Sequence, residues 1–116
     1  MNKVTDCIFC KIANGEIPSN IVFEDDKVIA FEDVNPQAPT HILIIPKKHI
    51  AHIDELENED KELIGHIFTK IGDISREFDL NQGFRVVVNN KSHGGQTVNH
   101  VHFHLLGGRS LQWPPG

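Results

Sequence analysis

Polar and apolar residues alternate strictly near the end of the chain, across residues 100–106, His-Val-His-Phe-His-Leu-Leu. In an extended segment, successive side chains point to opposite faces of a sheet. The three histidines are therefore predicted to line one face, and the apolar residues between them the other. This pattern predicts a strand with one side in the core and the other side available for chemistry.

Four further segments have the composition of strands: 20–24, 27–33, 40–45 and 84–89. The first two are short runs rich in Ile, Val and Phe that meet at Asp25-Asp26, which predicts a β-hairpin. The run at 40–45 is the most β-prone of the chain and is apolar on both faces, so we expect it at the centre of a sheet. Pro46 ends it.

Two segments carry apolar residues at helical spacing. Residues 7–13 predict a short helix that stops at Asn14-Gly15. A long amphipathic helix is predicted from Leu63 to Phe78, with the acidic stretch 54–62 as its solvated start near the positive end of the helix dipole. Residues 90–97 are expected to form a polar loop. Five strands, one long helix and one short helix predict a single α+β domain over residues 1–116, built on an antiparallel sheet.

The formal net charge of −5 and the absence of a long basic run argue against a polymeric nucleic acid as partner. No stretch approaches the roughly 20 apolar residues of a membrane span. The first residues lack the apolar run of a signal peptide. We therefore expect a cytoplasmic protein that binds neither membranes nor polymeric nucleic acid.

Three imidazoles on one face suit two chemistries. Histidines at alternate positions could bind a catalytic metal ion, or a neutral ring could attack phosphorus while a neighbour handles the proton. The preceding Gly94-Gly95-Gln96-Thr97 favours the second chemistry. Adjacent glycines allow backbone N–H groups to face an anion, and the amide of Gln96 and the hydroxyl of Thr97 could donate to a phosphate.

The chain has two cysteines, Cys7 and Cys10, spaced Cys-x-x-Cys. A disulfide framework needs more cysteines and an oxidising compartment. Metal ligation, thiol redox chemistry and simple burial all stay open from this spacing alone.

Three further histidines, His52, His66 and His93, match no motif and are expected on the surface.

Residues 100–106 resemble the H-φ-H-φ-H-φ-φ signature of the histidine triad (HIT) family of nucleotide hydrolases and transferases. The resemblance extends over nearly the whole chain, through residues 31–41, 45–49 and 94–97. The closing residues 107–116, Gly-Gly-Arg-Ser-Leu-Gln-Trp-Pro-Pro-Gly, are similar to the Hint branch of that family, the purine nucleoside phosphoramidases.

This resemblance implies that His102 attacks the α-phosphorus and forms a covalent nucleotidyl-histidine that water then hydrolyses. Its second ring nitrogen would be held by a backbone carbonyl close to His100. His104 would contact the phosphate and help protonate the departing amine, and His41 would support the site from behind. The implied catalytic set is His102, His104, Thr97, His100 and His41.

The resemblance also implies where a purine nucleotide lies. The phosphate would be held by Asn89, Gly95, Gln96 and Thr97 together with His102 and His104, and the ribose by Asp33. The base would lie in an apolar slot formed by Ile8, Phe9, Ile12, Phe31, Val34 and Leu43. In a homodimer with its two sheets side by side, Trp113 of each tail would approach the other copy's site.

Many prokaryotic members of the family carry a Cys₂His₂ set, which here is Cys7, Cys10, His49 and His100. The resemblance implies a structural zinc ion at this set, while catalysis itself needs no cofactor. Two reduced, buried thiols are the other interpretation. For function, the alternatives are a dinucleoside polyphosphate hydrolase, a nucleotide-binding regulatory or scaffold protein, and a hydrolase with a catalytic zinc.

Overall fold

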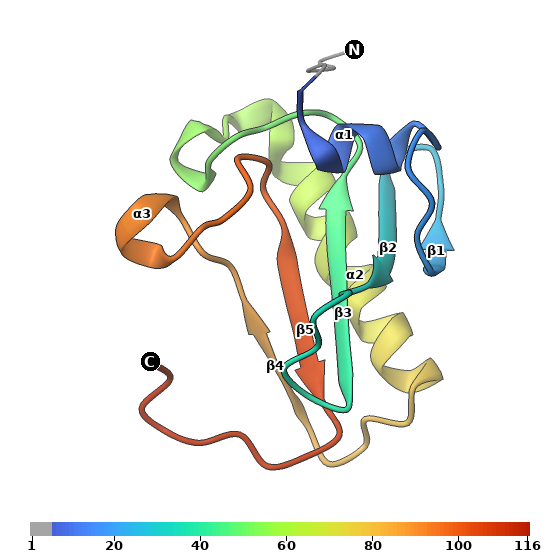
Figure 1. Ribbon diagram of the computed structural model, residues 1–116, viewed down its shortest axis with the longest axis vertical. Helices are drawn as coiled ribbons and strands as arrows, with labels where there is room; N and C mark the ends of the chain where they lie inside the picture. The colour runs from blue at the N-terminus through green and yellow to red at the C-terminus, as the bar shows by residue number, and fades with distance from the viewer. Residues whose placement is uncertain (1–5) are drawn as a thin grey trace.

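The computed structural model describes residues 6–116, which fold around one five-stranded sheet (Figure 1). The strands are β1 (Ile21–Glu24), β2 (Val28–Glu32), β3 (Thr40–Pro46), β4 (Phe84–Val87) and β5 (Phe103–Gly107). Their order across the sheet is β1-β2-β3-β5-β4, and every neighbouring pair is antiparallel. The predicted antiparallel α+β architecture is confirmed, with β3 at the centre of the sheet.

The histidine segment enters the sheet later than its pattern suggests. β5 begins at Phe103, so His100 and His102 precede the hydrogen-bonded ladder. The main-chain N–H groups of His100 and Val101 bond instead to the carbonyls of Val98 and Ile50. The predicted strand 84–89 is likewise shorter and ends at Val87. Alternation of the side chains nevertheless continues through the segment outside the ladder.

Helix α1 (Ile8–Ala13) is the predicted short helix, and its N-cap is Cys7, whose Sγ accepts a hydrogen bond from the Cys10 N–H at 3.3 Å. Helix α2 (Lys61–Glu77) begins near the end of the acidic stretch that we expected to open it, with Glu62 in its first turn. That stretch instead forms two 3₁₀ turns, Ile53–Glu55 and Asn58–Asp60. The second turn is closed by a capping box in which Glu57 and Asp60 bond each other's main-chain N–H.

A third helix, α3 (Lys91–Gly94), was not predicted. It is a single turn within the expected loop 90–97, and it ends where Gly95 takes a left-handed conformation at φ 82°. Glycine enters this region without the steric cost that a Cβ would impose. α3 stands apart from the sheet, next to the segment that leads into β5 (Figure 1).

Apolar side chains form a separate core on each face of the sheet. On one face, Val101, Phe103 and Leu105 pack with Ile67, Ile71 and Ile74 of α2. On the other face, Phe9 and Ile12 of α1 pack with Phe31 and Leu43. The histidines therefore lie on the α1 side of the sheet, opposite the long helix.

Among residues 6–116, no helix combines the length and the apolar composition needed to cross a membrane. Residues 1–5, on which the signal-peptide argument depends, lie outside the described residues.

Candidate active site

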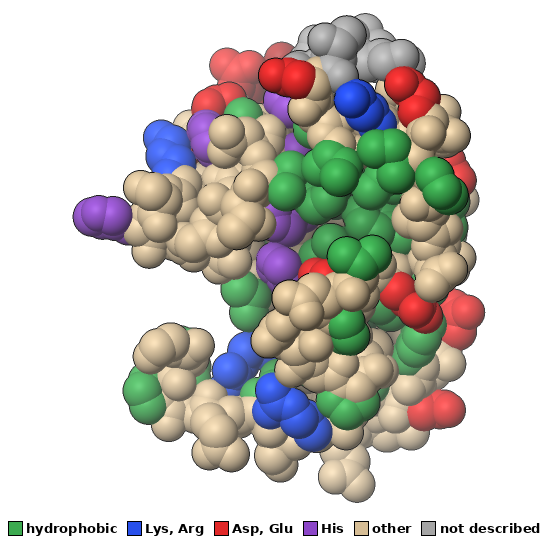
Figure 2. Space-filling model, in the orientation of Figure 1, with side chains coloured by type: hydrophobic (Ala, Val, Ile, Leu, Met, Phe, Trp, Pro, Cys, Tyr) green, Lys and Arg blue, Asp and Glu red, His purple; other side chains and the backbone are tan. Residues whose placement is uncertain are grey.

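The three triad imidazoles lie on the α1 face of the sheet, and each bonds to a different partner. The ring of Phe9 contacts two of them edge-on, with centroids 6.0 Å from His100 and 5.0 Å from His102. His104 is paired across the ladder with Leu43 on one side and Val87 on the other. The His102 and His104 rings are 5.0 Å apart. Figure 2 shows histidine side chains at the inner wall of a hollow between the α3 segment and the C-terminal tail.

His102 has the geometry of a neutral nucleophile. Its Nδ1 lies 2.7 Å from the main-chain oxygen of His100, which can only accept, so the proton is on Nδ1. Among the described residues, its Nε2 has no hydrogen-bond partner. Burial lowers the pKa of the ring below its ordinary value, against the opposing effects of the His100 carbonyl and Asp33. Nε2 therefore carries a lone pair that is available for attack.

The ring of His100 is turned away from His102, toward the two cysteines. Its Nε2–H donates to the carbonyl of Pro46 at 2.8 Å, which leaves Nδ1 as a lone pair. This Nδ1 lies 3.3 Å from Cys7 Sγ, 3.6 Å from Cys10 Sγ and 3.3 Å from His49 Nδ1. The side chain is 0% exposed, and burial chiefly lowers its pKa to about 4.

These four side chains fit a tetrahedral metal site. Their ligand atoms all lie within 4.8 Å of one another, and Cys10 Sγ is 3.3 Å from His49 Nδ1. With ordinary zinc bond lengths, a tetrahedron places nitrogen and sulfur ligands about 3.6 Å apart and two nitrogens about 3.3 Å apart. The nitrogen–nitrogen separation and one nitrogen–sulfur separation match these values, and the other two nitrogen–sulfur separations, at 3.3 Å, are slightly shorter. Because four protein ligands leave no open position, such an ion would be structural.

His104 and His41 form a second, separate pair. The main-chain N–H of Gln37 donates to His41 Nδ1 at 3.0 Å, so the His41 proton is on Nε2. His41 Nε2 is 2.9 Å from His104 Nδ1 and 3.4 Å from Asp33 Oδ2. His104 therefore accepts at Nδ1 and carries its own proton on Nε2, which is buried without a partner among the described residues.

Burial first, and then the nearby rings of His102 and His41, lower the pKa of His104 to about 4, while Asp33 opposes this shift. Burial also lowers the pKa of His41, again opposed by Asp33. Both rings are thus neutral near pH 7. An unpaired buried N–H is costly, so this group is a candidate hydrogen-bond donor.

The triad rings do not share a metal. His100 points at the cysteines, His102 at a carbonyl and His104 at His41, so their free nitrogens do not converge. Asp33, His41 and His104 also bring ligand atoms within 4.8 Å of one another. Both nitrogens of His41 already take part in hydrogen bonds there, which favours a hydrogen-bonded relay at this second group.

The expected phosphate loop is held in place by Gln96. The amide of Gln96 donates to the carbonyls of Ala51 and Val98 at 2.8 and 2.9 Å. Its oxygen accepts from the Lys91 main-chain N–H at 2.7 Å and from His52 Nδ1 at 3.0 Å. Gln96, expected to donate to phosphate, thus uses its side chain inside the protein. His52, expected to be an unremarkable surface residue, is part of this anchor.

Two other residues expected at the phosphate are available to a ligand. Thr97 is exposed, and its hydroxyl has no partner among residues 6–116. The amide of Asn89 is half-buried and equally without a bond in that part of the chain. Asn89 follows Arg85 and Val87 at alternate positions, and Val87 is the cross-strand neighbour of His104. The alternation places Asn89 on the histidine face.

The six residues expected around a base divide into two groups. Phe9, Ile12, Phe31 and Leu43 are buried in the core under α1. Ile8 is 47% exposed and Val34 is 97% exposed. The four buried residues form a floor, and the two exposed ones are apolar groups that a ligand could cover.

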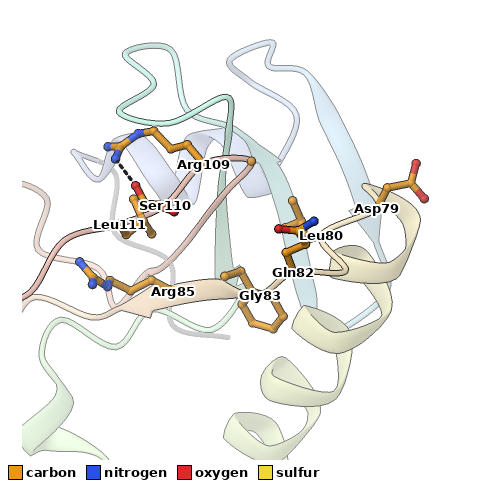
Figure 3. A pocket seen from close by; sticks show the side chains of 10 residues that line it. Asp79, Leu80, Gln82, Gly83, Arg85, Arg109, Ser110 and Leu111 are labelled. Carbon is orange, nitrogen blue, oxygen red and sulfur yellow. Dashed lines mark hydrogen bonds between the residues drawn. The ribbon is translucent and has the colours of Figure 1, made fainter.

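The C-terminal tail lies below the hollow. Arg85 of β4 donates to the main-chain oxygen of Gln112 at 2.7 Å. Between this tail and the start of β4 is a cavity of about 710 Å³, and Figure 3 shows Arg85, Arg109, Ser110 and Leu111 among the side chains that line it. Trp113 is 80% exposed, so most of its side chain is left uncovered by residues 6–116.

Comparison with known proteins places this site in a family. A family model described as the HIT domain matches residues 14–111. An uncharacterised HIT-like protein of Synechococcus elongatus is 53% identical over 111 residues, which is 96% of this chain and 97% of that protein. Its counterpart in Synechocystis is 49% identical over the same shares of both chains.

Solved structures agree with this relationship. The crystal structure of a HIT family hydrolase from Legionella pneumophila superposes with a TM-score of 0.94 at 53% identity, covering 96% of this chain and all of that one. A histidine triad protein from Clostridium difficile gives a TM-score of 0.92 at 50% identity, over 95% and 96% of the two chains. The fold is that of HIT family hydrolases, and the chain belongs to the HIT family.

Proposed function

We propose that this protein hydrolyses purine nucleoside phosphoramidates through a covalent nucleotidyl-histidine at His102. The observation that carries the proposal is the state of that ring. Nδ1–H is held by the His100 carbonyl, Nε2 has no partner in the part of the chain that the structure describes, and burial favours the neutral imidazole. A neutral nitrogen with a fixed tautomer is what attack on phosphorus requires.

In the first step, the Nε2 lone pair of His102 forms a bond to the α-phosphorus, and the P–N bond breaks with its electron pair on the nitrogen, which is protonated and leaves as a neutral amine. His104 Nε2–H faces the phosphate and the leaving nitrogen and assists departure. In the second step, water attacks the same phosphorus, which releases the nucleoside monophosphate and restores His102.

The surrounding residues would hold the substrate. Asn89 and Thr97 have unbonded side-chain donors for the phosphate, and Gln96 and Gly95 keep the loop in position. Asp33 would accept from ribose hydroxyls. The exposed apolar side chains of Ile8 and Val34 would cover the base above the floor that includes Phe9.

Mass spectrometry of an acid-quenched reaction with adenosine 5′-phosphoramidate tests the chemistry and the residue together. We expect nucleotide mass on the peptide that contains His102, and loss of turnover in His102→Ala. His93→Ala, which changes an exposed histidine of α3, is the matched control and should keep full activity. Undiminished turnover by His102→Ala would refute the mechanism.

The same assay separates the alternatives. Faster turnover of a dinucleoside polyphosphate than of the phosphoramidate would assign the protein to the polyphosphate hydrolases. Nucleotide binding without turnover of either compound would leave a regulatory or scaffold role.

We also propose that Cys7, Cys10, His49 and His100 bind a structural zinc ion, because their separations match a tetrahedral site. An ion there would tie α1 to the segment that precedes β5 and would take no part in the chemistry. Metal analysis of the purified protein should give one zinc per chain. Cys10→Ser should reduce that ratio, and an unchanged ratio would exclude this ligand set.

Finally, we propose a homodimer with the two sheets side by side. β4 lies at one edge of the sheet, and an uncovered edge strand offers unpaired backbone groups to a second chain. Large apolar side chains lie on β4 and on α2, with Phe84 42% and Phe68 50% exposed. Sedimentation should give a dimer mass for the native protein and a monomer for Phe84→Glu. A monomer in both cases would overturn this arrangement.

A further inference from the structure

The hydrogen bonds around His41 fix the positions of the ring protons on both His41 and His104. An imidazole pair has four nitrogens, and here each has a defined role. The Gln37 N–H occupies His41 Nδ1, one proton lies between His41 Nε2 and His104 Nδ1, and the last is on His104 Nε2. Two protons on two rings is the neutral state of the pair, so every available position is already filled.

A third proton has no favourable place in this arrangement. It would have to sit on His41 Nδ1, where it would meet the Gln37 N–H donor at 3.0 Å. Two donors that face each other lose the hydrogen bond and repel. If His104 instead gave its Nε2 proton away, the pair would become an anion. The pair can therefore donate a hydrogen bond but is poorly suited to supply a proton outright.

The tail also holds Gln37, through the carbonyl of the next peptide group along the chain. Arg109 Nη2 donates to the Gln37 carbonyl at 2.9 Å, and its Nη1 donates to the Ser110 carbonyl at 2.9 Å (Figure 3 shows the latter bond). Arg109 is exposed, and the hydrogen bonds of its guanidinium within residues 6–116 go to these two main-chain carbonyls. The loop that it clamps carries Asp33 at one end and His41 at the other.

We propose that Arg109 and the Gln37 main-chain amide are positioning groups that lock His41 and His104 as neutral rings in one tautomer, so that the substrate brings the proton that leaves on the amine. This proposal rests on the proposed phosphoramidase function. In the reacting substrate, nitrogen is already protonated. His102 Nε2 forms the new bond to phosphorus, and the P–N electron pair leaves with nitrogen as a neutral amine. His104 donates Nε2–H without releasing it.

The groups that could disturb this state are few. His102 from the segment that precedes β5 and Asp33 from the clamped loop interact with His104, and Val87 faces it from β4. Asp33 favours a positive charge on the His41–His104 pair, and the neighbouring ring of His102 opposes it. A bound phosphate anion would also favour the positive charge. The protonation state of the pair with phosphate bound is therefore the decisive test of its neutrality.

The direct measurement is ¹⁵N NMR of histidine-labelled protein, because ring nitrogens with and without a proton have well-separated shifts. Spectra are recorded between pH 6 and 8, with and without AMP. We expect His104 to carry a proton on Nε2 alone in both conditions. A cationic His104 ring with AMP bound, or a proton on Nδ1, would overturn the proposal. This measurement is independent of turnover, so inactivity toward the phosphoramidate would defeat the proposed function without deciding the tautomer.

Arg109 variants test the clamp. Arg109→Ala should show mixed tautomers and lower kcat/KM for the phosphoramidate by about 2- to 10-fold, the range expected for losing one hydrogen bond. Arg109→Lys should retain part of the kcat/KM that Arg109→Ala loses. The leaving group of a 4-nitrophenyl ester of AMP departs without a proton. For this substrate, kcat/KM of Arg109→Ala should differ from that of the native protein by less than about twofold.

A purely structural role for Arg109 would slow both substrates equally, and that outcome would overturn the clamp. The clamp would also be overturned if Arg109→Ala kept the tautomers and the rates of the native protein. Arg76→Ala serves as the matched control, since Arg76 is an exposed arginine of α2 whose side chain bonds Asp73.

Discussion

The partly buried ring of His104 makes the protein's stability depend on pH in a way that one substitution can isolate. Its pKa is lowered to about 4, first by burial and then by the neighbouring rings of His102 and His41. In the unfolded chain, the pKa returns to its ordinary value of about 6.5. As the pH falls below 6.5, the unfolded chain binds a proton that the folded protein does not. Stability from this group is thus intact above pH 6.5 and is lost progressively down to about pH 4.

The size of the effect follows from the shift. A pKa lowered from 6.5 to about 4 corresponds to at most about 3.5 kcal/mol, at roughly 1.4 kcal/mol per pH unit. The ring is only partly buried, and solvent screens part of its interactions. We therefore expect a loss of about 1–2 kcal/mol between pH 7.5 and pH 4.5.

Urea denaturation of the native protein and of His104→Gln at these two pH values measures this loss. Glutamine keeps an acceptor for His41 Nε2–H but does not titrate. Subtracting one protein's pH dependence from the other's cancels the contributions of the carboxylates. The native protein should lose about 1–2 kcal/mol more than the variant on acidification. His93→Gln, which alters an exposed histidine, is the control. A difference between native protein and His104→Gln that stays constant with pH would refute the argument.

Three further changes have defined outcomes. Phe9→Ala should lower the free energy of unfolding by about 3–5 kcal/mol, because this ring packs on Phe31 and His102; urea denaturation measures it, and a loss under about 1 kcal/mol would contradict the packing argument. If zinc is bound, its removal by a chelator should lower Tm by roughly 10 °C. This is the effect expected when a domain of this size loses a ligand present at about 100 times its Kd. Calorimetry with and without chelator measures the shift, and an unchanged Tm would contradict the proposed zinc site. Gly108→Ala should destabilise the fold by about 1–3 kcal/mol, since φ is +93° and an added Cβ would lie 2.9 Å from Pro39; full stability in thermal unfolding would show that the tail moves freely.

Local patterns were sufficient for most of the fold. The alternation at residues 100–106 correctly assigned the histidines to one face and Val101, Phe103 and Leu105 to the core, because the period of two survives outside the hydrogen-bonded ladder. The hairpin, the central strand and the body of α2 were also correct. In each of these, the side chains that create the pattern are the ones that the fold buries.

The errors lie where long-range bonds override local preference. The acidic stretch before α2 satisfies its N–H groups through a capping box between Glu57 and Asp60, with Lys48 bonded to Asp60 at 2.8 Å. The start of β5 is displaced because Val101 N–H bonds to Ile50. Neither partner can be identified from a sequence window. The Asn-x-x-x-Gly-Gly composition around α3 did contain a helix-ending signal that could have been used.

The role of Gln96 could not be predicted for a similar reason. An amide next to two glycines suggests a phosphate donor, but four internal partners occupy its oxygen and nitrogen. Only the fold brings Ala51 and His52 to it. The site thus separates into residues that contact substrate and residues that hold them, and sequence patterns alone do not distinguish the two.

His100 links the two halves of the site through different parts of the same residue. Its ring meets the cysteines, whereas its main-chain oxygen accepts from the His102 ring. A side-chain substitution removes the first contact and leaves the carbonyl in the chain. His100→Cys, which keeps a possible metal ligand, should therefore retain more activity than His100→Ala, although neither change removes an atom that bonds the nucleophile. If the two variants lost activity equally while keeping the native fold, the His100 ring itself, and not the position of its carbonyl, would be required for the reaction.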